Sequence, residues 1–148
     1  MALKFSPEIK KAQQKIYGQL SGWIVLGYAG GDNIEVQATS DNSNVEELVS
    51  HLKDDQVQYA LIRLVDTSKD VNKVDRQDGK TATKDIFIAW SGPSVRQIEK
   101  GKKASHAGSV ATHLQPFHAE LTAINRANFT ESVVRDKASP LSGSHVID

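Results

Sequence analysis

The stretch KDIFIAWSGPSV, which runs from Lys84 to Val95, decides the fold of this chain. Residues 85–90, DIFIAW, predict a strand that is apolar on both faces after Asp85, as in strands from the middle of a sheet. The Ser-Gly-Pro-Ser cluster behind them predicts a turn. Beyond the turn, helical spacing predicts a helix from residue 95 to about residue 114. Its apolar positions are Val95, Ile98, Val110 and Leu114. A buried strand therefore leads directly into a long helix.

Upstream of this stretch, the sequence predicts a helix, a hairpin, a second helix and another buried strand. Ser6-Pro7-Glu8 is typical of a helix start, because the hydroxyl caps free amides and the acid lies near the positive end of the helix dipole. The first helix has its apolar positions at Ile9, Ala12, Ile16 and Leu20, and Gly18 is expected to end it. Apolar runs at 23–29 and 34–38 on either side of a Gly-Gly-Asp-Asn turn predict the hairpin. Residues 45–52 have helical spacing, and residues 57–65 are apolar on both faces except at Arg63.

Downstream, the chain adds a polar arm, a further strand and a closing helix. Residues 66–84 are charged with mixed sign and predict a long exposed hairpin arm. Alternation at 117–122 predicts a fifth strand at or near a sheet edge, and Thr130 is expected to cap the last helix. The element order predicts an α+β (mixed) fold, with a central five-stranded mixed sheet flanked on both faces by helices. We expect a single domain over 1–138 and a flexible tail over 139–148.

Composition narrows the classes of protein to which the chain can belong. Its 148 residues carry 18 Lys+Arg and 18 Asp+Glu, and this neutral balance argues against a nucleic-acid partner. The lack of cysteine excludes disulfide scaffolds, zinc ribbons and thiol nucleophiles. No apolar run approaches the ~20 residues of a membrane span, and the N-terminus has no signal-peptide pattern. We therefore expect a cytoplasmic protein without a membrane span.

Catalytic motifs are missing from the sequence. It contains no P-loop, no G-x-S-x-G elbow and no H-E-x-x-H pair. His106, His113 and His118 lack the spacing of a metal site, so surface or capping histidines are expected. Acidic pairs such as Asp54-Asp55 fall among lysines in loops and are expected to be solvated charges. We expect no enzymatic activity, no cofactor and no metal.

Positive charge gathers near the start of the long predicted helix. Between residues 94 and 104, Glu99 is the one acid among four bases. Those bases are Arg96, Lys100, Lys102 and Lys103. A solvated helix face is the common explanation of such a run, and a docking face for an acidic partner is the functional one. Composition does not decide between the two.

The element order and the stretch from Lys84 to Val95 resemble the ADF homology (cofilin-type) domain, in particular its coactosin and drebrin-like branch. In that branch the stretch reads K-F-x-x-I-x-W-x-G-E-x-V, so Pro93 here replaces an acid. Residues 99–106, EKGKKASH, are similar to a basic A-S-H-containing segment of the drebrin-like proteins. Residues 129–138 resemble the closing helix. The resemblance implies the gelsolin/cofilin-like fold.

The resemblance also implies a function: a non-catalytic, monomeric protein of the actin cytoskeleton. Like coactosin, it would bind the side of F-actin, in preference to actin monomers, and modulate filament stability or capping. The actin-binding residues that it implies are Lys80, Lys84, Arg96, Lys100, Lys102, Lys103, Arg135 and Lys137. Because the surface of actin is acidic, we expect salt-sensitive binding of micromolar class.

Two other functions stay open at this point. The first is a cofilin-like factor that severs or depolymerises filaments and also binds G-actin. Cofilins carry a regulatory serine after the initiator methionine, whereas this chain has Ala2, and the family's S-K-R-S-K arm is here the less basic GKTATK at 79–84. The second is an adaptor whose basic helix binds acidic phospholipid head groups.

Overall fold

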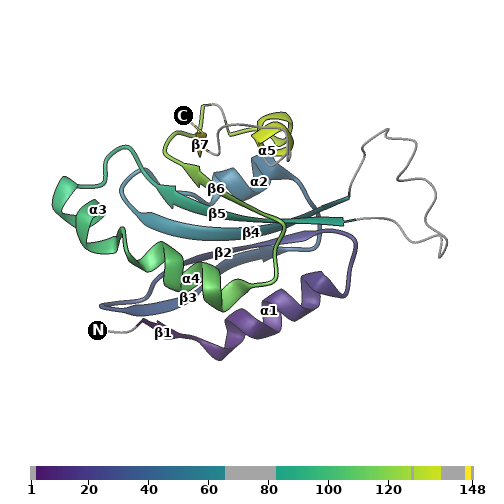
Figure 1. Cartoon of the computed structure of the whole chain (residues 1–148), viewed down its shortest axis with the longest axis horizontal. Helices are drawn as coiled ribbons and strands as arrows, with labels where there is room; N and C mark the ends of the chain where they lie inside the picture. The colour runs from purple at the N-terminus through teal and green to yellow at the C-terminus, as the bar shows by residue number, and fades with distance from the viewer. Residues whose placement is uncertain (1–2, 66–82, 128, 138–145, 148) are drawn as a thin grey trace.

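A mixed β-sheet forms the centre of the computed structural model, which describes residues 3–65, 83–127, 129–137 and 146–147 (Figure 1). The strands are β1 (Lys4–Phe5), β2 (Gly22–Tyr28), β3 (Asn33–Ser40), β4 (Val57–Val65), β5 (Thr83–Ser91), β6 (Ala119–Ala123) and β7 (Val146–Ile147). The helices are α1 (Pro7–Tyr17), α2 (Val45–Ser50), α3 (Gln97–Lys103), α4 (His106–Leu114) and α5 (Glu131–Lys137). None of these helices is long and apolar enough to cross a membrane.

The strands lie in the order β1-β3-β2-β4-β5-β6-β7. Antiparallel pairing joins β3, β2, β4 and β5, and parallel pairing adds β1, β6 and β7. The α+β class, the hairpin of β2 with β3 and the place of β6 near a sheet edge are as predicted. The strands β1 and β7 were not predicted, because two residues are too few to show a periodicity. The predicted arm lies outside the described residues except at its last positions, and so does most of the predicted tail.

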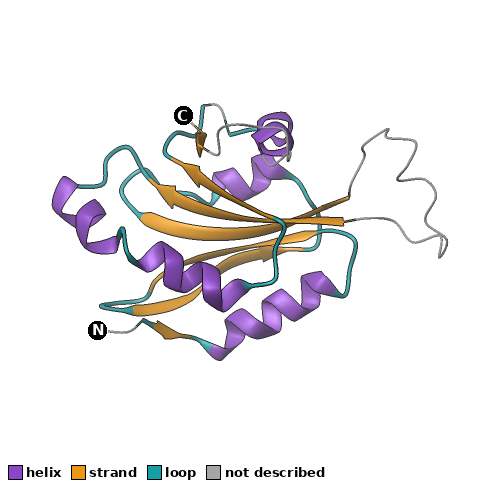
Figure 2. Ribbon diagram, in the orientation of Figure 1, coloured by secondary structure: helices purple, strands orange, loops and turns teal. Residues whose placement is uncertain are grey.

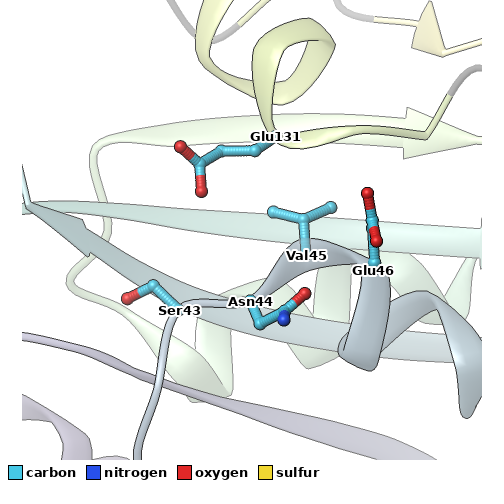
Figure 3. Close-up of a pocket in the computed structure, with 5 residues that line it drawn as sticks. All are labelled: Ser43, Asn44, Val45, Glu46 and Glu131. Atoms are coloured by element: carbon cyan, nitrogen blue, oxygen red, sulfur yellow. The ribbon is translucent and has the colours of Figure 1, made fainter.

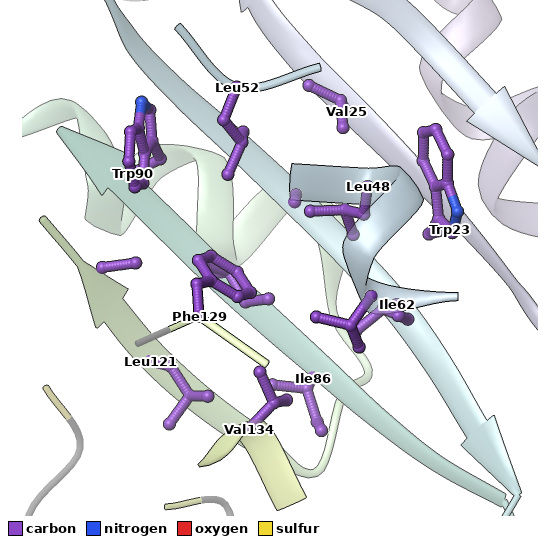
Figure 4. Packing of buried hydrophobic residues seen from close by; sticks show 14 of the residues in the cluster. Trp23, Val25, Leu48, Leu52, Ile62, Ile86, Trp90, Leu121, Phe129 and Val134 are labelled. Carbon is purple, nitrogen blue, oxygen red and sulfur yellow. The ribbon is translucent and has the colours of Figure 1, made fainter. Parts of the chain in front are cut away.

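Helices cover both faces of the sheet and create two apolar cores (Figure 2). On one face, α2 and α5 pack over a cluster that includes Trp23, Trp90 and Phe129 (Figure 4). On the other face, α1 and α4 pack over a cluster that includes Tyr59 and Phe87. This double burial explains why the sequences of β2, β4 and β5 are apolar on both faces. Both tryptophans are core residues, as expected.

The helix α1 begins and ends as predicted, with Gly18 at its C-cap position. The Ser6 hydroxyl accepts a hydrogen bond from the Glu8 amide at 3.3 Å, and Pro7 occupies the first turn. Three side chains of α1 donate hydrogen bonds to backbone carbonyls at the end of α4: Lys10, Gln13 and Tyr17. The prediction that Leu20 faces the core is wrong. Its side chain is exposed because the helix stops at Gly18.

The helix predicted from 95 to 114 is two helices, α3 and α4, separated by Ala104 and Ser105. Only α4 packs on the core, through Val110, Ala111 and Leu114. Ile98 was predicted to face inward, and this is wrong, because it is 76% exposed. The break interrupts the regular helical rotation between the two helices. Ile98 and Val110 therefore no longer lie on one common helix face.

Arg63, the one charged residue in the apolar run of β4, forms a buried ion pair with Asp85 on β5. Its Nε and Nη2 donate to the two carboxylate oxygens at 2.7 and 2.9 Å. Its Nη1 donates to the carbonyls of Tyr17 and Gln19 beyond the end of α1. Hydrogen bonding to Asp85 raises the pKa of the guanidinium. Arg63 is therefore a paired charge inside the sheet, and its contacts join β4, β5 and the end of α1.

The turn from β5 into α3 packs against the loop before β4. The Gly92 and Ser94 amides donate to the carbonyls of Gln56 and Asp54 at 3.1 and 2.8 Å. A Cβ on Gly92 would lie 2.1 Å from the Asp54 carbonyl oxygen, which real atoms cannot do. The Trp90 indole donates to the Lys53 carbonyl at 2.8 Å and fixes the same loop. Gly92 thus allows the close backbone contact that sets where α3 begins.

We predict that Asp85→Ala lowers the free energy of unfolding by roughly 3–5 kcal/mol, because it leaves a buried guanidinium without its carboxylate. Urea denaturation measures this. Glu8→Ala is the matched control, since Glu8 pairs with Lys11 across an exposed 3.6 Å contact and its loss changes stability by less than about 1 kcal/mol. Equal losses in the two variants would contradict the prediction.

We also predict that Gly92→Ala destabilises the protein by about 1–3 kcal/mol, because the added methyl group meets backbone atoms that cannot rotate away. Gly101→Ala is the contrasting variant. Its added Cβ meets nothing within 4 Å, and alanine favours a helix by roughly 0.5–1 kcal/mol over glycine. Thermal unfolding of both variants checks the opposite signs. A neutral Gly92→Ala would show that the turn relaxes freely.

Candidate functional site

The basic segment of the sequence forms an exposed surface on and around α3. Arg96 and Lys102 are exposed, and Lys100 is half-buried. Lys103 turns back onto the protein instead, where its ammonium pairs with Glu99 at 2.8 Å and lies 4.0 Å from the centre of the Tyr28 ring. Two of the four predicted bases, Arg96 and Lys102, are therefore exposed, and Lys103 helps to attach the helix.

Ile98 lies among these bases and was missed as a site residue. It has the largest exposed fraction of the large apolar side chains in the described part of the chain. Apolar side chains at the centre of a charged surface are frequent anchors of protein interfaces. Sequence reasoning counted Ile98 as core because its spacing fits a continuous helix. The low number of apolar residues in QIEKGKK was the signal that could have corrected this.

A hollow of about 630 Å³ separates α3 from the tip of the β2–β3 hairpin. Its lining residues are Gly31, Asp32, Arg96, Ile98, Glu99, Lys102, Lys103 and His106. Gly30 and Gly31 both have positive φ, so the hairpin can turn sharply at this edge. The lining combines an apolar side chain with several bases, which suits an acidic protein surface better than a small apolar ligand.

A chain of hydrogen bonds lies beneath α3. The Tyr28 hydroxyl is 2.8 Å from the Tyr59 hydroxyl and 2.8 Å from Nδ1 of His106, the first residue of α4. Burial raises the pKa of both tyrosines, so both hydroxyls are protonated at neutral pH. The chain links the centre of the sheet to the junction of α3 and α4.

The structure does not bring all predicted site residues together. Lys84 is at the start of β5, half-buried and opposite Leu64 of β4. α3 follows the other end of this strand, about 23 Å away at ~3.3 Å per residue (Figure 1). Lys80 lies outside the described residues. Arg135 and Lys137 belong to α5, and their side chains are not described.

A second hollow, of about 440 Å³, lies between the starts of α2 and α5 (Figure 3). Ser43, Asn44, Val45, Glu46 and Glu131 line it. Its polar groups have structural roles, since Asn44 caps α2 by accepting from the Glu47 amide at 3.0 Å. The Ser43 hydroxyl donates to the Arg63 carbonyl at 2.6 Å, which is a structural contact as well. Within the described residues, no three His, Asp or Glu side chains gather as a metal site.

Comparison with curated proteins finds drebrin-like proteins and a coactosin, the two groups that the sequence was found to resemble. The drebrin-like protein of Mus musculus is 24% identical over 141 residues, which are 94% of this chain and 30% of that protein. Coactosin of Entamoeba histolytica is 23% identical over 123 residues, 82% of this chain and 77% of that protein. The chain thus spans less than a third of the length of the drebrin-like relatives.

Solved structures share the fold at low identity. Cofilin from Streptomyces griseoflavus matches with a TM-score of 0.74 and 18% identity, covering 93% of this chain and all of that one. Human coactosin-like protein matches with a TM-score of 0.70 and 17% identity, covering 93% and 98%. The family model described as "Cofilin/tropomyosin-type actin-binding protein" matches residues 2–139. The chain therefore belongs to the cofilin-type (ADF homology) family of non-catalytic actin-binding domains and is related to coactosin and the drebrin-like proteins.

Proposed function

We propose that this chain binds the side of actin filaments through the surface of α3 and leaves the filaments intact. The observation that carries the proposal is the exposure of Ile98 between two exposed bases, Arg96 and Lys102. Membership in an actin-binding family supplies the partner. Its curated relatives, coactosin and the drebrin-like proteins, belong to the branch that the sequence resemblance associates with filament binding.

Ile98 and the bases around it have different tasks in this proposal. An isoleucine transferred from water to a pocket on the partner contributes affinity, since apolar burial is the main favourable term in association. The exposed charges of Arg96 and Lys102 steer the encounter and set the orientation, and each contributes little by itself. Affinity is therefore expected to depend mainly on Ile98, and its salt dependence mainly on the bases.

Lys84 extends the proposal to a second contact. It lies at the opposite end of β5 from α3, beside the segment that carries Lys80. A filament presents neighbouring subunits in a fixed arrangement, so two separated surfaces can bind at once and reinforce each other. A monomer offers less opportunity for this. This pair of separated contacts is the reason to prefer filaments over monomers as the partner. Arg135 and Lys137 of α5 are further candidates for actin-binding residues.

We propose a monomeric protein of the cytoplasmic actin cytoskeleton, with no cofactor. Effects on filament stability or capping would follow from occupancy of the filament side. Severing and lipid binding are the alternatives that the experiment below must separate from this function.

We predict that Ile98→Ala weakens binding to F-actin by about tenfold or more, in the range of interface anchors. Leu20→Ala is the matched control, because Leu20 is also a large exposed apolar residue but lies beyond α1, away from the α3 hollow. It is expected to bind as the wild type does. High-speed co-sedimentation with F-actin measures both.

The same assay tests the charges. Raising KCl from about 50 to about 200 mM is expected to reduce pelleting of the wild type, and Lys84→Ala or a triple change of Lys100, Lys102 and Lys103 to alanine weakens binding further at low salt. Shortened filaments would replace the proposal with a cofilin-like activity. Failure to pellet at saturating actin, with flotation on anionic vesicles, would replace it with lipid binding.

A further inference from the structure

We propose that Tyr28 is a positioning residue for actin binding: its hydroxyl and ring hold α3 in the orientation that presents Ile98. The inference rests on the proposed function, because it assigns the attachment of the same surface. Neither the family match nor the predicted basic residues point to Tyr28. The contacts that it makes on both sides of the α3–α4 junction do.

The helix α3 has few other means of attachment. It buries none of its residues. Arg96 at its N-cap position forms no side-chain capping bond, and Ser105, which follows the helix, does not cap α4 with its side chain either. By contrast, α4 is fixed by its buried residues and by the hydrogen bonds from α1. A seven-residue helix with exposed sides is marginal by itself, so contacts at its ends decide its position.

Tyr28 supplies such contacts from a rigid base. It is the last residue of β2, a strand that lies between β3 and β4, and it pairs with Ile34 of β3. Its hydroxyl bonds to His106 at the start of α4, and its ring lies under the ammonium of Lys103 in the last turn of α3. Lys103 in turn holds Glu99, one turn earlier, at 2.8 Å. Tyr28 therefore contacts the end of α3 directly at Lys103 and is linked through Lys103 to Glu99 in the first turn.

Tyr59 fixes the hydroxyl of Tyr28 from below. Tyr59 is buried on β4, and its own hydroxyl lies 2.8 Å from that of Tyr28. Each protonated hydroxyl has a single hydrogen, and both hydrogens have a partner when Tyr59 donates to Tyr28 and Tyr28 donates to Nδ1 of His106. Linked hydrogen bonds in a partly buried site hold their members more firmly than separate ones. The position of the Tyr28 hydroxyl is thus set by the core.

The consequence for binding follows from the shared hollow. Ile98, Glu99, Lys103 and His106 all line the space between α3 and the hairpin. If Tyr28 releases His106 and Lys103, α3 can tilt, and Ile98 is presented correctly in only a fraction of molecules. The apparent affinity falls by that fraction, although no residue that touches actin has changed.

The test compares Tyr28→Phe with Tyr59→Phe. Both remove one hydroxyl and keep the ring, but Tyr59→Phe leaves the bond between Tyr28 and His106 in place. We expect Tyr28→Phe to weaken F-actin co-sedimentation by about three- to tenfold, the equivalent of one net hydrogen bond, and to speed amide hydrogen exchange in residues 97–106. Tyr59→Phe is expected to change both less than Tyr28→Phe does, because the bond between Tyr28 and His106 remains. Equal effects in the two variants would overturn the proposal.

Variants of His106 test the same link from its other side. His106→Asn keeps a polar atom near the place of Nδ1 and should restore most of the binding that His106→Leu loses. Combining Tyr28→Phe with His106→Leu should weaken binding no more than the stronger single change does, because each change removes the same Tyr28–His106 hydrogen bond. Fully multiplied losses would show that the residues act separately and would contradict the proposal.

Hydrogen exchange separates this proposal from the proposed function. If the wild type does not pellet with F-actin but Tyr28→Phe speeds exchange selectively in residues 97–106, the proposed function is wrong and the attachment of α3 by Tyr28 stands. If the wild type pellets and Tyr28→Phe leaves exchange in α3 and binding unchanged, the positioning role is wrong and the proposed function stands. Urea denaturation of each variant verifies that it folds.

Discussion

The antiparallel pairing of β4 with β5 is the interaction on which the rest of the structure depends. The two strands pair over their full lengths, from Val57 opposite Ser91 to Val65 opposite Thr83. Both are buried on both faces, so they contribute to the α2–α5 core and to the α1–α4 core at once. The pairing also fixes the two ends of β5. Lys84 lies at one end and the turn into α3 at the other, so this one register sets the separation of the two proposed contacts.

Polar contacts anchor each end of this strand pair. At the end near Lys84, the Arg63 guanidinium donates to both carboxylate oxygens of Asp85 and to a backbone carbonyl at the end of α1. A buried charge pair of this kind specifies one arrangement, because any other register would leave a charge unpaired. At the other end, Trp90 and Gly92 bind the loop before β4 through backbone groups. These contacts therefore fix where α3 begins, but they do not fix the direction of the helix axis.

The direction of α3 depends on weaker contacts, and this difference suits a binding surface. Burying Ile98 against the sheet would stabilise the folded protein but would remove the apolar anchor from the surface. The protein instead keeps Ile98 exposed and attaches α3 through a tyrosine, a histidine and a lysine that leave the outer side free. Elements that bind partners are commonly those with the least buried apolar surface. The conflict between the apolar spacing in the sequence and its exposure in the fold occurs at this functional candidate.

Periodicity and turn residues in the sequence determined the major strands, the hairpin, the two-sided core, the Ser6 cap and the charged surface at α3, because each depends on neighbours within a few residues. The tertiary structure alone decided three other features. The break after Lys103 turned Ile98 outward, since which face of a helix is buried depends on what packs against it. Lys84 and the α3 bases were placed at opposite ends of β5, a separation that strand pairing sets and composition does not record. Tyr28, Tyr59 and His106 met across a separation of 78 residues in the chain, and no local pattern predicts a hydrogen bond between side chains so distant in sequence.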